Sequence, residues 1–454
     1  MYYTRAVRTR FQQLPICWLS AGVLLAAAAT QAPVDATTAW ARAVQSSWID
    51  PATAARVQPL VHDHEVRVDT WRQQESPASV ELAVLTRPGT TASQQLIDAA
   101  RQSLDVYAAM LGPPPFDRLT IVDLPVHAGL TDAAYPGIAI ASVRWLTARR
   151  EFALEREMSA AIGRQYALTL VTAAVHDSWF AEGLAAYLAT RAEQLRFDPR
   201  PSLTRRYFGG FVPHAIRAVT ANPLDPRPRV SALAGLLRPV DAPWRLARGA
   251  DLDRAKRLAV AFHALERFIG WPALQAALSA FVQGHTGQNP TLRGFTELLS
   301  AQRGADMAWF FDQAMRLDAR LDYAVVNLQS SPASPAGWHT TVEVRRLGAA
   351  TFAGTSVARD IAASRALEVV TRFADGNEMT EWIDGRDTEW RFEYSSATPA
   401  TLASVDPEAI VLVDDDRTNN ARALNPAANP TAMRLAFNWL AWLQDAMLTC
   451  TAVL

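Results

Sequence analysis

The chain has 454 residues, half of them apolar, and is long enough for two or three packed domains because single cores stop growing at about 250 to 300 residues. A net charge of −1 with 20% charged residues excludes a disordered polyelectrolyte and leaves no basic field to attract nucleic acid. We therefore expect a globular protein without a nucleic-acid partner.

The N-terminus has the pattern of a secretory signal. Arginines within the first ten residues precede an apolar run from Leu14 to Ala29, and small residues follow. The run is short for a bilayer span of about 20 residues, so cleavage is favoured over anchoring. We expect residues 1–32 to be a signal peptide and the protein to be exported to a periplasmic or other extracytoplasmic space. The mature chain then keeps only Cys450, which excludes an intrachain disulfide.

Residues 33–78 form a polar, weakly patterned N-terminal segment, in which His62 to Glu65 have neither strand nor helix context. Beyond it, alternation and apolar periodicity predict a strand, a helix and two strands in turn. An order of this kind, followed by helices, is typical of a mixed α+β unit. The expected elements are 79–85, 91–112, 117–126 and 135–145.

Helical periodicity dominates from about residue 149 to 317, and a period of two replaces it afterwards. Asp375 and Gly376 lie between alternating runs and predict a hairpin turn. We expect a small antiparallel β-sandwich over residues 319–420. The clearest helices are 254–270, 271–284 and 291–315, and the clearest strands are 339–346, 365–385, 389–396 and 408–416.

Residues 431–454 predict an apolar C-terminal helix. Leu435, Trp439, Trp442 and Ala446 recur at helical spacing, and Trp is the natural residue of the membrane interface. Asp445 at mid-span would cost about 2.5 to 3.5 kcal/mol in lipid. Two alternatives stay open, namely a helix in contact with a membrane, spanning or interfacial, and a helix docked on the core.

The stretch that bears on chemistry is "SAAIGRQYALTLVTAAVHDSWFAEGLAAYLA", Ser159 to Ala189. A zinc peptidase of the HExxH type places two histidines on one helix face, a glutamate beside the first to activate water, and a third ligand on the next helix. Here the second helix supplies Glu182, followed by Gly183. The first helix has no histidine.

The second helix resembles that of the M1 (gluzincin) aminopeptidase family, which typically reads W-L-N-E-G-F-A-x-Y. Three further stretches resemble the family in its own order: "MLGPPPFDRLTIVDLP", "AAYPGIAI" and "FTELLSAQRGADMAWFFDQAM". The resemblance implies a thermolysin-like mixed sheet with a helical peptidase-type domain over residues 79–318. The β-sandwich and the C-terminal helix would follow it.

Carried over to this chain, the resemblance implies a degenerate zinc site. Aligning "RQYALTLV" on the family's H-Q-W-x-x-N-L-V places the two zinc histidines at Ala160 and Arg164 and the general base at Ala161. The spacer to the second helix is one residue short, and a register shifted by one offers Ser159, Ala160 and Gly163 instead. A methyl group cannot bind zinc, and a guanidinium has no lone pair to donate.

The substrate positions implied by the resemblance are also changed. The glutamate that would hold a substrate's amino group falls on Ala134, and the transition-state tyrosine falls on Ala255 or Arg254. Glu182 is then left without a metal, and an unpaired buried carboxylate costs several kcal/mol. We therefore predict an ion pair between Arg164 and Glu182. The alternative is that Glu182 is a solvated helix residue.

Other groups of polar residues have two interpretations each. The sequence "HDHE", His62 to Glu65, is the densest set of metal-capable residues, and alternation on a strand would put His62 and His64 on one face, where Zn²⁺ or Cu²⁺ could bind weakly. We favour the interpretation that the set holds no metal.

Three further segments are weighed in the same way. His176, Asp177 and Ser178 are adjacent, but a catalytic triad needs spatial convergence, and an N-cap by Asp177 or Ser178 explains them better. Asp414 to Asn420 is favoured as a solvated turn over a Ca²⁺ loop. The Pro- and Arg-rich residues 221–249 are interpreted as a lid or binding loop.

The first hypothesis is thus an exported, non-catalytic M1 peptidase-like protein without a cofactor, which binds a peptide or protein in the former substrate cleft or acts as a scaffold. The alternative is an active metallopeptidase of the aminopeptidase type with a non-standard zinc site, because a fold does not determine a function. A third hypothesis makes the chain an accessory subunit of a membrane complex that attaches through residues 431–454.

Overall fold

The computed structural model describes eleven ranges of the chain and a few residues between and beyond them. All of them belong to one compact unit, Asp35–Leu454. The predicted signal peptide, residues 221–249 and most of 431–454 lie outside the described residues, and the predicted domain boundaries stay predictions. The described residues are 35–74, 76–90, 92–125, 134–141, 153–172, 178–196, 250–315, 320–333, 336–352, 367–407, 410, 411, 414, 416, 419–425, 436, 440 and 443.

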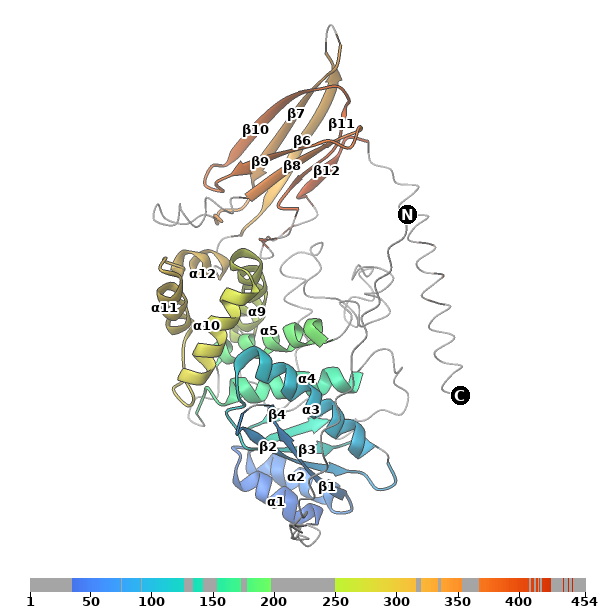
Figure 1. Cartoon of the computed structure of the whole chain (residues 1–454), viewed down its shortest axis with the longest axis vertical. Helices are drawn as coiled ribbons and strands as arrows, with labels where there is room; N and C mark the ends of the chain where they lie inside the picture. Colours follow the sequence, from blue (N-terminus) through green and yellow to red (C-terminus); the bar gives the residue numbers. More distant parts are fainter. Residues whose placement is uncertain are drawn as a thin grey trace, which may run out of the picture. The chain divides into compact units, whose positions relative to one another are not determined.

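A five-stranded mixed sheet with the order β1-β2-β3-β5-β4 forms the first layer (Figure 1). Its three central strands run parallel, and an antiparallel strand closes each edge. The mixed α+β expectation is confirmed, as are the three expected strands. The bounds are β1 Glu65–Arg72, β2 Ser79–Thr86, β3 Arg118–Asp123, β4 Ala134–Tyr135 and β5 Ile138–Ala141.

Both faces of this sheet are buried because successive side chains of a strand point to opposite sides. Leu82 and Val84 of β2 join a large core with α3 (Ala92–Leu111) and α4 (Ala153–Leu168), while Leu85 is buried on the other face. Figure 1 shows α3 and α4 on one side of the sheet and two N-terminal helices on the other.

These N-terminal helices were not predicted, because the segment was interpreted only as polar and weakly patterned. Residues 35–61 form α1 (Ala36–Gln45) and α2 (Pro51–Val61), each with an aspartate cap: Asp35 accepts from Thr38 N and Asp50 from Thr53 N, both at 2.8 Å. Both helices are short, and the buried residues Ala36, Ala39, Trp40 and Ala43 recur at helical spacing in α1, a signal that was overlooked. The N-caps were a further signal.

The second layer of helices follows the prediction closely. α9 (Ala250–Ile269), α10 (Trp271–Gly284), α11 (Leu292–Arg303) and α12 (Ala308–Ala314) cover the expected ranges. Gly304 ends α11 in the left-handed conformation, φ 63°. Edge-to-face aromatic contacts join the four helices, with Phe262, Phe281, Phe295 and Phe311 at centroid separations of 5.2 to 6.1 Å.

The last described strands form two antiparallel sheets, as expected for a β-sandwich, with the orders β10-β7-β6 and β12-β11-β8-β9. The predicted hairpin is present, with Gly376 at φ 88°. The strands are β6 Tyr323–Pro332, β7 Trp338–Arg346, β8 Leu367–Phe373, β9 Glu378–Ile383, β10 Glu389–Ser396, β11 Ala400–Val405 and β12 Ala421–Ala423.

One expected strand, 408–416, is wrong for the residues described within it. Ile410 and Val411 donate their backbone N–H groups to the Asp406 carboxylate, and Asp414 makes an isolated bridge with Leu321. A short apolar run was mistaken for a strand where an aspartate organises a turn. The strand that pairs with β8 is the preceding β11.

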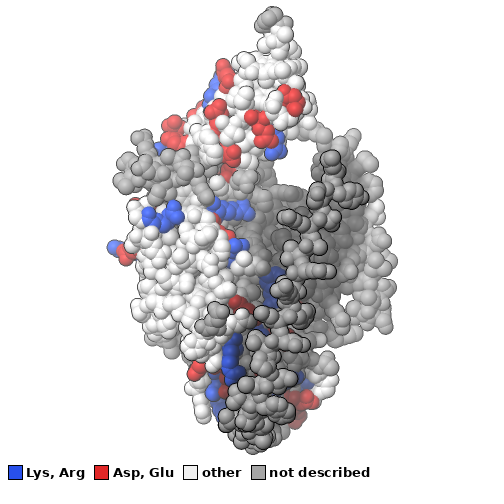
Figure 2. Space-filling model, viewed as in Figure 1, with Lys and Arg blue, Asp and Glu red and all other residues white. Residues whose placement is uncertain are grey.

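Two surface observations complete the fold. Figure 2 shows Lys/Arg and Asp/Glu side chains interleaved over the described part of the face drawn. Among the described residues, no helix combines the length and apolar character needed to cross a bilayer. Ala436, Leu440 and Leu443 are helical and exposed, and the rest of the predicted C-terminal helix lies outside the description.

Candidate functional site

The predicted ion pair between α4 and α5 (Trp179–Arg196) is present. Arg164 Nη2 lies 3.6 Å from Glu182 Oε1, and these side chains are 13% and 11% exposed. The alternative of a solvated Glu182 is therefore wrong. Ala160 and Ala161 lie one turn before Arg164 on the same half-buried side of α4.

Three consecutive residues of α4 bind three different elements. Arg164 faces α5. Gln165 is buried and clamps the β4–β5 turn: its Oε1 accepts from Gly137 N at 2.9 Å, and its Nε2 donates to Tyr135 O at 2.8 Å and Ile138 O at 3.0 Å. The Tyr166 ring stacks on Tyr107 of α3 with centroids 5.4 Å apart. The helix that carries Arg164 is thus held against the sheet, α3 and α5.

The start of α5 is fixed by Ser178, whose Oγ accepts from Ala181 N at 3.2 Å. Of the two N-caps expected from the sequence, Ser178 fills the role; His176 and Asp177 lie outside the described residues. Glu182 stands in the first turn, where the helix dipole favours a carboxylate.

Gly183, next to Glu182, permits α9 to approach α5. A Cβ at this position would lie 2.7 Å from Ala255 O and 2.9 Å from Leu258 Cβ. The Glu-Gly pair therefore combines a side chain turned toward α4 with a backbone packed against α9.

A polar network on the α9 side of α5 was not predicted. The Tyr187 hydroxyl donates to Glu266 Oε2 at 2.8 Å, and Arg191 Nη2 lies 3.2 Å from Glu266 Oε1. The Arg191 guanidinium also stacks over Trp271, 4.4 Å from the ring centroid. Burial strongly raises the pKa of Tyr187, and the Glu266 carboxylate raises it further. No local pattern signals this network, because Tyr187 and Glu266 are 79 positions apart in the chain.

His263 adjoins this network and is buried, 3% exposed. Its ring lies 4.6 Å from the Tyr187 ring, centroid to centroid. Burial, with smaller contributions from Arg267 and Arg191, lowers its pKa well below the usual value. The imidazole is therefore neutral at pH 7.

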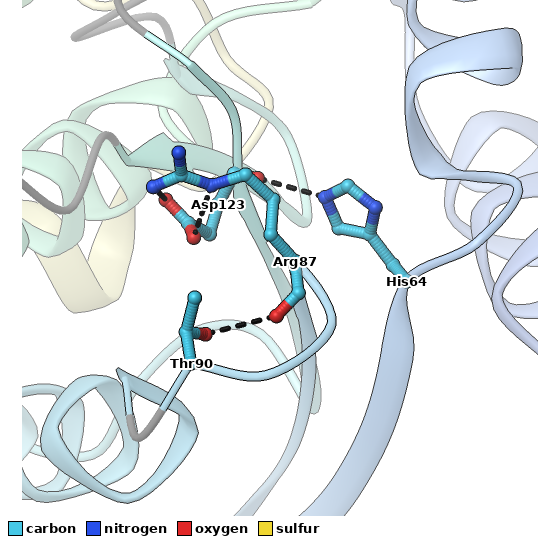
Figure 3. A network of polar contacts seen from close by, with 4 residues as sticks. All are labelled: His64, Arg87, Thr90 and Asp123. Carbon is cyan, nitrogen blue, oxygen red and sulfur yellow. Dashed lines mark hydrogen bonds and ion pairs between the residues drawn. The ribbon is translucent and has the colours of Figure 1, made fainter.

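A second polar network lies at the carboxyl ends of the parallel strands (Figure 3). Asp123, fully buried at the end of β3, accepts from Arg87 Nε at 3.0 Å and Nη2 at 3.3 Å. His64 Nε2 lies 2.8 Å from the Asp123 carbonyl oxygen and donates to it, and Thr90 Oγ1 donates to Arg87 O. This network joins the segment after α2 to the sheet, which is a structural role.

The same geometry overturns the idea that His62 and His64 share a strand face. His62 lies in the turn after α2 with its side chain 75% exposed, while His64 is buried and β1 begins only at Glu65. His62 Nδ1 contacts Asp63 Oδ1 at 2.9 Å. The backbone turn separates the two imidazoles that a strand would have aligned.

Asp414, the first residue of the segment interpreted as a solvated turn, is buried. Its carboxylate accepts from Tyr323 N at 3.1 Å and Asp416 N at 3.0 Å. The turn interpretation holds at this position, but the turn is anchored in the protein rather than solvated.

The two substrate positions are structurally ordinary. Ala134 lies in β4 and pairs with Ala139 of β5. Ala255 is buried in α9, where its carbonyl faces Gly183, and Arg254 is exposed.

The residues at the expected zinc positions do not fit a zinc ion. Two methyl groups, a guanidinium and a carboxylate offer one donor side chain, Glu182, whereas protein zinc sites use three or four. Over the described ranges, no group of three or more His, Cys, Asp or Glu residues is placed to hold a metal ion. These side chains can form an ion pair between Arg164 and Glu182, beside the half-buried Ala160 and Ala161 of α4.

No family model matches the sequence, and no curated protein gives a significant match. Among solved structures, the chain is similar to aminopeptidase A of Legionella pneumophila in complex with aspartic acid, with 14% identity, a TM-score of 0.47, and coverage of 76% of this chain and 37% of that one. It is also similar to an M1 zinc metallopeptidase from Deinococcus radiodurans, with 19% identity, a TM-score of 0.38, and coverage of 56% and 52%. This chain therefore spans about a third to a half of those structures, and the similarity concerns the fold alone.

Proposed function

We propose that this protein is an exported M1 peptidase-like protein that does not hydrolyse peptides and uses the surface between α4 and α5 to bind a peptide or protein, or as a scaffold. The observation that carries the proposal is the Arg164–Glu182 pair, 3.6 Å apart and largely buried. Where the family resemblance expects a metal ion, a guanidinium faces the remaining carboxylate.

The orientation of α4 supports the alignment on which this proposal depends. Ala160, Ala161 and Arg164 lie on the half-buried side, and Arg164 reaches α5. In the shifted register Gly163 would be a ligand position, yet a Cβ there would meet the Tyr107 hydroxyl of α3. The contact of Arg164 with Glu182 supports the unshifted alignment, in which both residues belong to one site.

The resulting surface favours a neutral or mixed ligand over a polyanion. The ion pair cancels its own charge, and the neighbouring side chains at positions 160 and 161 are methyl groups. A peptide backbone with small side chains fits such a surface, because close approach costs little where only methyl groups project.

The test is the metal content and peptidase activity of the purified full chain. We expect far less than one zinc per chain and no EDTA-sensitive cleavage of aminopeptidase substrates, and the Glu182→Gln variant should behave identically. Stoichiometric zinc, with cleavage that EDTA and Glu182→Gln both abolish, would establish the alternative of an active metallopeptidase with a non-standard site.

Export and membrane association are separate parts of the proposal. They are supported by the signal-like residues 1–32 and the Trp-rich residues 431–454. Cell fractionation of the full chain and of a variant lacking residues 431–454 tests them. Release from the membrane fraction on deletion supports the accessory-subunit hypothesis, whereas equal distribution of both forms contradicts it.

A further inference from the structure

The contact between α5 and α9 contains a histidine whose surroundings tolerate only its neutral form. His263 is buried beside the Tyr187 ring, and none of the described residues hydrogen-bonds to its Nε2. A buried polar atom without a partner costs about 1 to 3 kcal/mol relative to an apolar one. An apolar aromatic residue at position 263 would therefore give a more stable core. Packing alone does not explain why an imidazole stands there.

The charges around the ring oppose its protonation. Arg267 of α9 and Arg191 of α5 both act on it, and Glu266, the nearby carboxylate, already binds the Tyr187 hydroxyl and Arg191. The other helices in contact with α9 are α10, α11 and α12. No group in their described parts adds a charge that acts on the ring. A protonated His263 would thus add a third positive charge to those of Arg267 and Arg191, and no carboxylate is among the described groups that act on the ring.

We propose that His263 is a proton-sensitive lock between α5 and α9, and that uptake of one solvent proton by its imidazole loosens α5. The protonated ring must either move out to solvent or form an ion pair with Glu266 in place of Tyr187 and Arg191. Both changes break contacts between α5 and α9. The proposal goes beyond the proposed function and does not depend on it, because it concerns the α9 side of α5.

The direction of the pH effect follows from the lowered pKa of His263. A histidine in an unfolded chain has a pKa of about 6.5, so above that pH neither the folded nor the unfolded state binds the proton, and the contact is intact. Below a pH of about 6.5, His263 is protonated in the unfolded state but not in the folded state. The free energy of unfolding therefore falls with pH until the pKa of His263 in the folded state is reached. One such proton raises the unfolding equilibrium constant about tenfold per pH unit.

The test compares the full chain with His263→Phe by urea unfolding at pH 7.5 and 5.5. We expect the unfolding constant of the wild type to rise about tenfold more than that of the variant on acidification. His285→Phe is the matched control: His285 is half-buried and its Nδ1 contacts Phe281 O at 2.9 Å, so this variant should keep the wild-type pH response. An equal response of wild type and His263→Phe would overturn the lock.

Hydrogen exchange of the wild type gives a second measurement if His263→Phe does not fold. After correction for intrinsic rates, amides of α5 should lose more protection between pH 7.5 and 5.5 than those of α3, which follow only the change in global stability. Equal losses in α5 and α3 would contradict a local lock, and a greater loss in α5 would support it.

Discussion

Helix α5 meets its two neighbours in different ways. Toward α9 it approaches so closely that Gly183 leaves no room for a methyl group, and Tyr187 donates a 2.8 Å hydrogen bond to Glu266. Toward α4 it presents Glu182, whose carboxylate lies 3.6 Å from Arg164. Close backbone packing and the proposed former zinc position therefore lie on separate sides of one helix. Side chains on the α4 side can change without disturbing the packing on the α9 side, which stabilises the fold.

The largest expected effect comes from breaking the α9 side at Gly183. Gly183→Ala places a Cβ 2.7 Å from a backbone oxygen that cannot rotate away, and we expect a loss of about 2 to 3 kcal/mol in the free energy of unfolding, measured by urea titration. Gly284→Ala is the control, because no atom lies within 4 Å of its added Cβ, and it should be neutral or stabilising. Equal stability of the two variants would show that α5 and α9 are not close-packed.

The α4 side is examined by a double-mutant cycle of Arg164→Met and Glu182→Gln. Each single change leaves a mostly buried charge without this partner, and we expect a coupling energy of about 2 kcal/mol from unfolding titrations. The exposed pair Arg293–Glu297, with side chains 88% and 64% exposed, should show no coupling beyond error in the same cycle. Equal coupling in both pairs would contradict a buried ion pair.

The smallest expected effect concerns the hydrogen bond between α5 and α9. Tyr187→Phe removes the hydroxyl that donates to Glu266, and we expect a loss of about 1.5 kcal/mol, since hydrogen bonds to charged groups contribute most. Tyr166→Phe is the matched control, because the Tyr166 hydroxyl donates over 3.3 Å to a neutral acceptor, Gly112 O. A loss at Tyr166 as large as that at Tyr187 would show that the Glu266 contact has no special weight.

Long periodic segments were predicted well because their local signals and their tertiary environment agree. The helix 271–284 and the strand 389–396 are found with the expected bounds. The helices α1 and α2 were missed although their aspartate caps and the apolar spacing of α1 are local signals. The segment 408–416 failed because a short apolar run leads into a turn, and a local pattern does not contain what such a run packs against.

The candidate site divides in the same way. The Arg164–Glu182 pair was predictable, since the motif alignment puts both residues at one site and burial demands a partner for the carboxylate. The Tyr187–Glu266–Arg191 network was not, because Glu266 lies 79 positions after Tyr187 in the chain and no motif connects them. Only the packing of α5 on α9 brings them together.

The sequence by itself determined the mixed α+β order and the absence of zinc-binding side chains at Ala160, Ala161 and Arg164. These properties follow from local periodicity and from the donor chemistry of single side chains. The tertiary structure alone decided the loss of water around Glu182, the separation of His62 from His64, and the burial of His263 beside two arginines. Burial and charge proximity arise between elements distant in the chain, and they set the energies on which function depends.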